Sequence, residues 1–492
     1  MEFSSPVFLF LFLPIFLTLF YLTRKAAPNL FLLIASLIFY AWGEGYYIMV
    51  LLISIIVNQV FGSLINKSEA PTLKKALFIA AVVFNLGLLS FFKYSAFILQ
   101  NLAIPGSAQA IHSPLGISFF TFQALSYLID IYRKTVPNEG GLFHFALYMA
   151  FFPKLATGPI TPYHVLVKQI SAPKLRKNDL SCGIQRFIIG LGKKILIADS
   201  AARIANQVFT LPVGQQTAAL AWLGIIGYSI QIYFDFSGYS DMAIGIGRIC
   251  GFRLPENFNY PYFAKSIKEF WTRWHISLAQ WLRIYLFLPI AYAMLRKIKK
   301  DHLLLIKAED WSYYVGAFFT FLLCGIWHGA NWTFIIWGLF YGALLIIEHA
   351  GLGKLMKKRA PFIRLIYTQL LVAIAWVFFR SDTPYYALSY LKAMFGFGGG
   401  NGDLIYPALF LDSELVFFLI IGIAFSFPII PAIKKWIEKR VKHLQNGENK
   451  STRIFVNSGL IIFGNLYLIT ILLISILFMI TGTYNPFIYF RF

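Results

Sequence analysis

The sequence contains few charged residues and few cysteines for its length. Charged residues make up 13% of the 492 residues, about half of the share in a typical soluble domain. Cys182, Cys250 and Cys324 are scattered, so they provide neither a disulfide framework nor the spacing of a zinc site, and no metal site is expected. Hydrophobic residues make up 58% and the mean hydropathy is +0.68. This composition excludes an ordinary soluble protein and predicts an all-α polytopic membrane protein.

Acidic residues are also scarce, with 21 Asp and Glu against 43 Lys and Arg and a net charge of +22. In a soluble chain this excess would suggest nucleic-acid binding. Here about 34 of the 43 basic residues lie in alternate loops between hydrophobic runs, so the positive-inside rule explains them and no nucleic acid is expected. These basic loops, which we expect to be cytoplasmic, are residues 23–28, 66–76, 133–140, 161–180, 248–283, 296–310, 350–364 and 434–453.

The hydrophobic runs predict a bundle of about 11–12 transmembrane helices in a single domain, residues 1–492. Re-entrant or interfacial pieces are expected near 142–160 and 284–295, and a basic amphipathic helix at 434–446 is expected on the inner leaflet. The N terminus should lie outside, because the first apolar run follows an acid and precedes Arg24 and Lys25. The predicted crossings are 7–22, 29–43, 46–65, 77–94, 116–132, 183–206, 217–236, 311–327, 332–349, 364–380, 414–432 and 456–480.

A histidine stands in the middle of the apolar stretch 321–349. An ionisable group at membrane depth is costly, and its default interpretation is functional. Small residues, Gly325 and Gly329 among them, leave space around the His328 imidazole, and Trp327, Trp332 and Asn331 surround it in sequence. The alternative is a histidine that bonds to a neighbouring helix and stabilises packing. The stretch alone favours neither interpretation over the other.

Residues 231–283 are unusually polar for a membrane protein. Asp235 and Asp241 are expected near the cytoplasmic end of an apolar span, followed by an irregular segment, PENFNYPYF, packed into a cytoplasmic mouth. A helix is then predicted at 265–283. It could grip a phosphate-rich ligand, or it could anchor at the membrane interface with its basic side chains extended to water. Its basic and aromatic residues are Lys268, Arg273, His275, Arg283, Trp271, Trp274 and Trp281.

Several long motifs resemble those of a known family. They are LGISFFTFQALSYLIDIYR (115–133), FFPKLATGPI (151–160), FDFSGYSDMAIGIGR (234–248), LPENFNYPYF (254–263), EFWTRWHISLAQWLR (269–283) and GIWHGANWTFIIWG (325–338). The chain resembles the membrane-bound O-acyltransferase (MBOAT) family, in its bacterial branch of alginate O-acetylation proteins, from about residue 110 to 350 and again at 482–492. The resemblance implies helices around a central tunnel, in a bacterial inner membrane. It also implies acyl transfer from a cytoplasmic thioester, acetyl-CoA, with no tightly bound cofactor.

The resemblance also assigns roles to residues. His328 matches the catalytic histidine of the family and His275 its second characteristic histidine, while Asn331 would help to orient His328. Tyr489, in an aromatic C-terminal tail expected outside, matches a possible acyl relay; the alternative is an interfacial aromatic belt. The residues expected to bind donor or substrate are Trp327, Trp332, Arg273, Trp274, Arg283, Asp235 and Asp241.

One departure from the family pattern concerns the donor mouth. Relatives have Arg-Asp-Tyr followed by a Gly-Gly turn, whereas this chain has Arg283-Ile284-Tyr285 and then PIAYAM. The expected function is O-acetylation of an exported, alginate-type polysaccharide. The expected partners are membrane lipid, the polysaccharide and an extracytoplasmic serine hydrolase-like acetyltransferase. The alternatives are peptidoglycan O-acetylation, teichoic-acid D-alanylation, a transporter or flippase without acyl chemistry, and a scaffold.

Overall fold

The computed structural model describes residues 1–104, 111–136, 141–298, 302–303, 306–399, 405–445, 450–482 and 487–488. Helices make up almost all of it, together with one antiparallel pair of two-residue strands, β1 (His302–Leu303) and β2 (Ile306–Lys307). The longer helices are α1 (Leu13–Thr23), α2 (Pro28–Glu44), α3 (Ile48–Lys67), α4 (Pro71–Leu89), α6 (Ile117–Tyr132), α7 (Gly141–Ala150), α10 (Asp179–Gly192), α11 (Asp199–Phe209), α12 (Ala218–Ile249), α15 (Leu288–Lys297), α16 (Ala308–His328), α17 (Trp332–Ile347), α19 (Pro361–Arg380), α20 (Pro384–Met394), α21 (Ser413–Phe425), α22 (Ile429–Gln445) and α23 (Lys450–Thr481).

Within the residues that the structure describes, seven helical segments are long and apolar enough to cross a membrane, or eight if the bent pair α21 and α22 is one span. The all-helical membrane class is therefore confirmed, with a span count below the expected 11–12. Several differences add up to this lower count. The predicted spans 183–206 and 311–327 are not among the seven segments, and the prediction of a re-entrant or interfacial piece at 284–295 is wrong, since Ile276–Lys297 is one of them. The predicted spans 29–43 and 46–65 form one long segment, Pro28–Lys67, and the expected spans at 7–22 and 116–132 are short helices, Phe8–Thr23 and Ile117–Tyr132.

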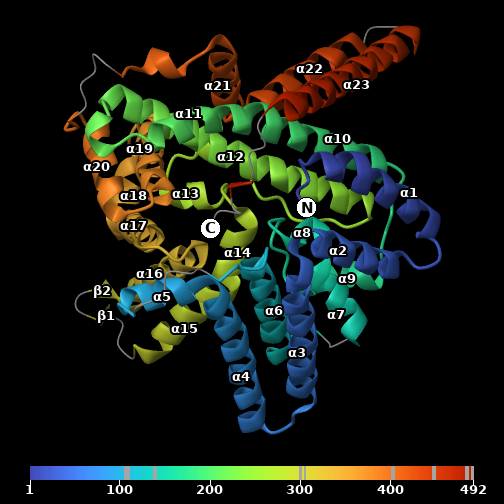
Figure 1. The fold of residues 1–492 in the computed structure, drawn as a ribbon, viewed down its shortest axis with the longest axis vertical. Coiled ribbons are helices and arrows are strands. Elements are labelled where there is room, and N and C mark those ends of the chain that lie inside the picture. Colours follow the sequence, from blue (N-terminus) through green and yellow to red (C-terminus); the bar gives the residue numbers. More distant parts are fainter. Residues whose placement is uncertain are drawn as a thin grey trace.

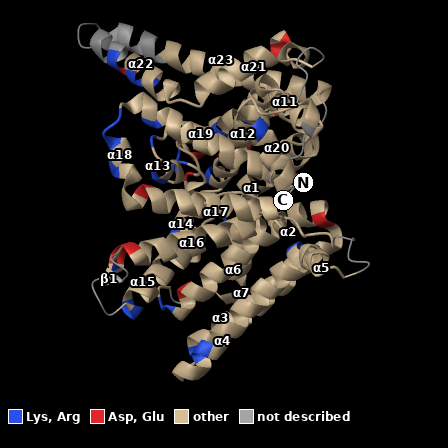
Figure 2. Ribbon diagram, turned by 90° about the vertical axis from the view of Figure 1, so that its left-hand side faces the viewer, with Lys and Arg blue, Asp and Glu red and all other residues tan. Residues whose placement is uncertain are grey.

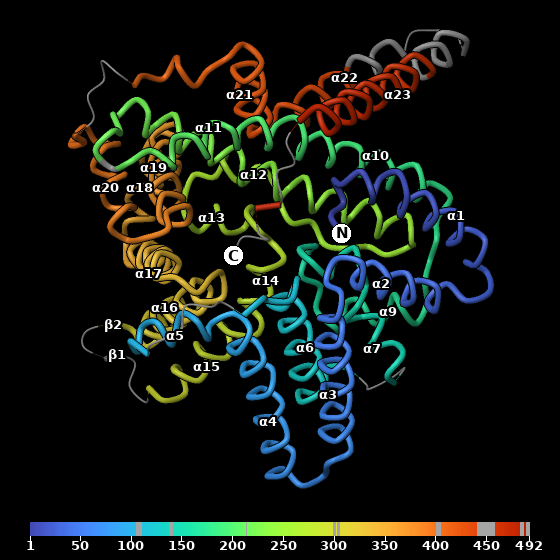
Figure 3. Tube along the Cα trace, in the orientation of Figure 1, coloured from blue at the N-terminus to red at the C-terminus, as the bar shows by residue number. Residues whose placement is uncertain are grey.

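The long helix α12 lies at the centre of the fold, and α10, the π-helical turn η4 (Lys193–Ala198) and α11 run along it (Figures 1 and 3). A glycine pair permits this close approach: a Cβ on Gly238 would lie 2.7 Å from the Gly190 carbonyl oxygen. Small residues at helix contacts are typical of membrane bundles. The prediction that this span ends at residue 236 is wrong, since α12 continues to Ile249.

The continuation of α12 depends on ion pairs inside the bundle. Asp235 lies 3.0 Å from the Lys194 ammonium, and Asp241 lies 2.7 Å from Lys193 and 2.6 Å from Arg186. A carboxylate paired in this way can remain on a buried helix, because its desolvation is offset by the neighbouring cation.

The segment after α12 is irregular, as predicted, but the predicted helix at 265–283 is wrong. Two short helices, α13 (Ile267–Trp271) and α14 (Ile276–Leu282), replace it. The break is at His275, whose φ of 42° is left-handed and uncommon outside glycine, at a cost of about 1–2 kcal/mol. The tryptophans of this region, Trp271, Trp274 and Trp281, are buried rather than interfacial.

Basic residues gather on one side of the molecule. Figure 2 shows Lys and Arg over α13, α15, α18 (Gly353–Lys357) and α22 on one side, with the N terminus on the opposite side. The first residues fold inward, and Phe3 is fully buried against Tyr239 of α12, with ring centroids 4.7 Å apart.

Candidate active site

His328 is the last residue of α16, and its side chain lies in an aromatic enclosure. Its ring centroid is 4.9 Å from those of Trp327 and Trp337 and 5.1 Å from that of Phe379. The residue is 4% exposed. After His328 the chain is extended at Gly329, with φ −171°, so the helix ends at the imidazole. The ring is therefore held at the end of a rigid element.

The close packing of α16 against α17 depends on glycines, one of which, Gly325, was expected to leave space around the imidazole. A Cβ on Gly325 would collide with the Phe334 carbonyl oxygen, and a Cβ on Gly338 with the Phe321 carbonyl oxygen. Gly325 therefore permits close packing of α17 on α16 instead of leaving an empty space beside the ring.

Two cavities adjoin this histidine. A small one of about 90 Å³ is lined by His328 itself, together with Lys93, Ser113, Ser118 and Thr157. A larger one of about 480 Å³ also includes Lys93 and Ser113 in its wall. The rest of its wall comes from several elements, among them Gln231, Gly329, Ala330, Asn331, Phe379, Arg380, Asp382 and Ile488. The end of α16 is thus accessible from two spaces that share two residues.

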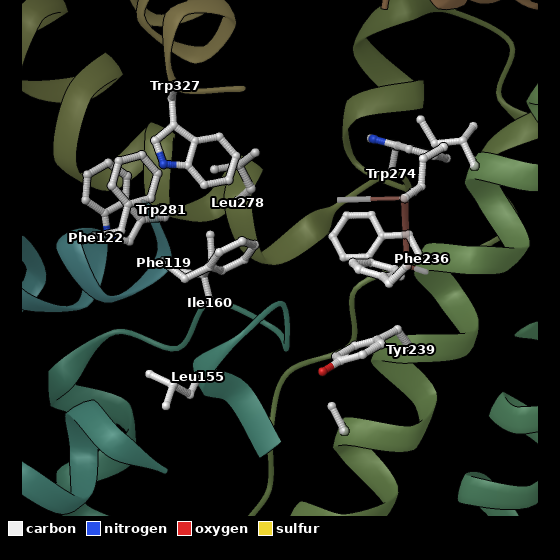
Figure 4. Close-up of a cluster of buried hydrophobic side chains, with 14 of the residues drawn as sticks. Phe119, Phe122, Leu155, Ile160, Phe236, Tyr239, Trp274, Leu278, Trp281 and Trp327 are labelled. Carbon is white, nitrogen blue, oxygen red and sulfur yellow. The ribbon is translucent and has the colours of Figure 1, made fainter. Parts of the chain in front are cut away.

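A stack of three rings supports this region from behind. Phe122 of α6 stacks on Trp281 at 3.9 Å and on Trp327 at 5.0 Å, as Figure 4 shows. The Trp281 indole N–H donates to the Ser126 hydroxyl at 2.6 Å, which fixes the ring in its plane. Stacked aromatic rings of this kind contribute about 0.5–1.5 kcal/mol per pair beyond the area that they bury.

The second histidine, His275, is fully buried and has a defined partner. Its Nδ1 lies 3.0 Å from Oδ1 of Asn257, which also accepts from the backbone N–H and the hydroxyl of Ser277. The amide group of Asn257 donates to the Ser240 hydroxyl. Since Asn257 Oδ1 acts as an acceptor, Nδ1 of His275 carries the proton in this bond, which directs Nε2 away from Asn257.

A further cavity of about 530 Å³ lies between α10 and α12 and extends to α23. Arg186, Lys193 and Asp241 contribute charge to its wall, and Asn257 and Ser240 line it as well. Asn257, the hydrogen-bond partner of His275, therefore lies in the wall of this cavity.

Comparison with known proteins decides the family. The sequence profile of the membrane-bound O-acyltransferase family matches residues 134–391, slightly more than half of the chain. The chain belongs to the membrane-bound O-acyltransferase family. It is therefore an O-acyltransferase and a multi-pass membrane protein, and the family implies an acyl donor.

Individual relatives of this O-acyltransferase match most of its length. It is 41% identical to "Probable alginate O-acetylase AlgI" of Pseudomonas aeruginosa, over 81% of this chain and 75% of that protein. It is 39% identical to the protein of the same name from Azotobacter vinelandii, over 81% and 79%. A "Peptidoglycan O-acetyltransferase" of Helicobacter pylori is 33% identical, over 81% and 80%. Both buried histidines lie inside the segment that matches the MBOAT family.

Several predicted site residues of the O-acyltransferase lie elsewhere than expected. Trp332 is 51% exposed and donates its indole N–H to Asn101 at 3.0 Å, so Trp337 takes its expected place beside His328. Asn331 caps α17, because its Oδ1 accepts from the Thr333 N–H, and its amide donates to the Asp382 carbonyl at 2.7 Å. Asn331 also forms part of the wall of the larger cavity.

The basic and acidic residues expected at a donor mouth are mostly engaged within the protein. Arg273 pairs with Glu269 at 2.8 Å, Trp274 is buried against Trp376 with ring centroids 4.8 Å apart, and Arg283 is exposed. Asp235 accepts from the Ile488 N–H at 2.8 Å, in addition to its ion pair with Lys194. Asp241 alone of this group lines the cavity between α10 and α12.

The aromatic tail is described at Phe487 and Ile488, and Tyr489 lies outside the described residues. The Phe487 N–H donates to the Glu2 carboxylate at 3.3 Å, and its ring packs on Tyr239 with centroids 4.6 Å apart. Ile488 lines the larger cavity beside Gly329 and Ala330. This part of the chain therefore reaches the cavity next to His328.

Among the residues near the histidines that were not predicted as site residues are Lys93, Asn257 and Trp337. A lysine inside an apolar span is itself a signal of function, so Lys93 could have been found. Asn257 lies in LPENFNYPYF, which the sequence analysis identified as an irregular segment and as a family motif without assigning a role to this residue. Trp337 could not be chosen over Trp332, because that choice depends on where α16 ends.

Proposed function

We propose that this O-acyltransferase moves an acetyl group from cytoplasmic acetyl-CoA across the membrane for O-acetylation of an exported, alginate-type polysaccharide, with His328 as the catalytic base. The observation that carries the proposal is the placement of His328 at the end of α16. There its ring lies against one cavity, while the next residues, Gly329 and Ala330, line a larger one. A titratable group at such a junction can serve a donor and an acceptor that arrive from different sides.

The chemical step is an acyl transfer from a thioester to a hydroxyl. His328 would remove the proton from the attacking hydroxyl as its oxygen forms a bond to the acetyl carbonyl carbon. The carbon–sulfur bond then breaks, and the thiol leaves with the proton returned by the imidazole. General base catalysis of this kind contributes about 10²–10⁴-fold in rate.

Acetyl-CoA carries phosphates, which require cations. The cavity between α10 and α12 offers Arg186 and Lys193 next to Asn257, the partner of His275. Arginine binds phosphate through a planar fork of N–H donors. The basic side of the molecule, by the positive-inside rule, would be cytoplasmic, in a bacterial inner membrane. The donor would approach from that side.

The acceptor side would include the aromatic tail. Ile488, the residue before Tyr489 in the sequence, lines the larger cavity. This position supports a relay in which the Tyr489 phenol carries the acetyl group as an aryl ester. An extracytoplasmic serine hydrolase-like acetyltransferase would then receive it and esterify the sugar hydroxyls. The names of the relatives from Pseudomonas and Azotobacter favour an alginate-type acceptor.

Peptidoglycan is the second candidate acceptor, because the 33% identical relative from Helicobacter pylori is named for it. When the gene for this protein is deleted in the source organism, the cells should lose acetyl esters from the exported polysaccharide and keep them on peptidoglycan. Loss from peptidoglycan alone would replace the first candidate by the second.

The experiment that tests catalysis uses His328→Ala at normal membrane abundance. The proposal predicts loss of polysaccharide acetylation, and unchanged acetylation would remove the central role of His328. In a second experiment the purified protein is given acetyl-CoA labelled in the acetyl group. Label should appear on the protein and be lost in Tyr489→Phe, whereas the exposed control Tyr385→Phe should retain it. Label that survives Tyr489→Phe would exclude the relay, and a protein that consumes no thioester would favour a transporter.

A further inference from the structure

The C-terminal end of α16 requires hydrogen-bond donors from outside the helix. The last carbonyls of any α-helix have no intrahelical partner, and at membrane depth unsatisfied carbonyls cost several kcal/mol each. At this helix end the carbonyls belong to Ile326, Trp327 and His328. Whatever satisfies them also fixes the direction in which His328 leaves the helix.

Two consecutive side chains supply these donors. The Tyr94 hydroxyl donates to the Ile326 carbonyl at 2.6 Å. The Lys93 ammonium donates to the Trp327 carbonyl at 2.7 Å and to the His328 carbonyl at 3.1 Å. We call Lys93 and Tyr94 the helix-end clamp. All three terminal carbonyls are therefore bonded by one dipeptide, 232 to 235 residues away in the sequence.

The clamp residues come from a local irregularity in a transmembrane segment. They lie in η3 (Ser90–Tyr94), a π-helical turn between α4 and α5 (Ser95–Asn101). π-helical turns inside longer helices are frequent at functional sites, because they redirect side chains. Here the turn aims two adjacent polar side chains at the same helix end.

Lys93 has no remaining donor to offer to a substrate in this arrangement. A lysine ammonium has three N–H groups. Two donate to the carbonyls of α16, and the third donates to the Ser118 hydroxyl on α6 at 3.2 Å. Although Lys93 lines both cavities, its bonds are directed at the protein. This geometry is that of a positioning residue.

The charge of Lys93 adds to its hydrogen bonds. The C-terminal end of a helix carries a partial negative charge of roughly half an electron, which a cation stabilises. The hydrogen-bond partners of Lys93 are three neutral oxygens, so the helix end supplies the negative potential that a carboxylate would otherwise provide. The lysine and the helix end therefore stabilise each other inside the bundle.

We propose that the helix-end clamp, Lys93 and Tyr94, positions His328 for acyl transfer by holding the last turn of α16 against α6. The inference rests on the proposed role of His328. It assigns a function to a lysine within an apolar span and to the residue that follows it. Removal of the clamp should misplace the imidazole without removing any group that touches the substrate.

The test compares purified, full-length variants in lipid nanodiscs by steady-state transfer from acetyl-CoA. Lys93→Met should lower kcat by about 100-fold, the loss typical of a displacement of about 1 Å, while KM for acetyl-CoA stays within about twofold. Lys93→Arg keeps the charge and the donors and should retain at least about tenfold more activity than Lys93→Met. Tyr94→Phe removes one hydrogen bond and should lower kcat by about 2- to 12-fold.

Controls separate this inference from the proposed function. Lys75→Met, at an exposed lysine of α4, should match the parent protein. If His328→Ala retains activity, the proposed function fails. If His328→Ala is inactive while folded Lys93→Met keeps its kcat, or changes only KM, the clamp alone is overturned. Equal losses in Lys93→Arg and Lys93→Met would also overturn it. Should Lys93→Met fail to fold, an unchanged kcat in Tyr94→Phe would overturn the clamp.

Discussion

The carboxylate of Asp235 accepts a hydrogen bond from the backbone N–H of Ile488 at 2.8 Å, joining the centre of α12 to a residue 253 positions later. The same carboxylate is paired with the buried Lys194 ammonium. One aspartate thus links an ion pair in the bundle to the segment that reaches the larger cavity.

Replacement of Asp235 should therefore affect stability and the attachment of this segment. Asp235→Leu removes one carboxylate that pairs with the buried Lys194 ammonium, whose contact with Asp199 at 2.8 Å remains, and should lower the free energy of unfolding by about 3 kcal/mol. Asp235→Asn keeps an acceptor for the Ile488 N–H and should lower it less. Thermal unfolding of the detergent-solubilised protein measures both. Identical melting temperatures for parent and Asp235→Leu would contradict this role.

Trp337 and Trp332 form a matched pair for testing the wall around His328. Trp337→Ala removes a buried ring that contacts the imidazole, so kcat should fall by at least about tenfold, with a loss of stability of about 3–5 kcal/mol. Trp332→Ala removes an exposed ring bonded to Asn101 and should change kcat less than about twofold. A larger kcat effect at Trp332 would show that the sequence-based assignment was the better one.

Asn257 should matter through His275. Asn257→Ala leaves Nδ1 of a buried imidazole without its acceptor, at a cost of about 1–3 kcal/mol, and we expect kcat to fall by about 5- to 150-fold. The neighbouring Asn259, whose side chain is exposed, provides the control Asn259→Ala, for which we expect normal activity. Steady-state kinetics with acetyl-CoA check both variants. Equal activity in the two would argue against positioning of His275 by Asn257.

The contact between α16 and α17 should not tolerate a methyl group. In Gly338→Ala the new Cβ would collide with the Phe321 carbonyl oxygen, so the helices must separate and stability should fall by about 1–3 kcal/mol. Gly464→Ala in α23, where a Cβ meets nothing within 4 Å, should leave the melting temperature unchanged or raise it. A destabilised control or an unaffected Gly338→Ala would refute the role of close packing.

The sequence was sufficient to predict the class of the fold and to single out two histidines, which the structure shows to be buried, but not to predict the residues around them. His328 is conspicuous because an imidazole in an apolar run is costly, and a costly residue persists for a reason. Trp332 is only four positions from it in sequence, yet the chain is extended at Gly329 and Trp337 faces the ring instead. The direction of the chain after Gly329 cannot be predicted from the neighbouring residues alone.

The acidic residues illustrate the same limit over longer distances. Asp235 and Asp241 are polar residues of a polar stretch, which suggested an open mouth and the end of a span. Their partners Lys193, Lys194 and Arg186 come from α10 and η4, so α12 continues through the bundle with its charges compensated. Whether a membrane helix can continue past a carboxylate depends on ion pairs with neighbouring helices. Such pairs cannot be predicted from the sequence of either helix alone.

The contact between Phe487 and Glu2 has a consequence for biogenesis. Glu2 and Phe487, which are 485 positions apart in the sequence, meet beside α12. At about 5–20 residues per second, synthesis of the intervening chain takes roughly 25–100 seconds, so this contact forms late, after the helices between the two residues have been made. The attachment of the N-terminal segment to the C-terminal tail is therefore a closing step of assembly and cannot guide the insertion of the helices between them.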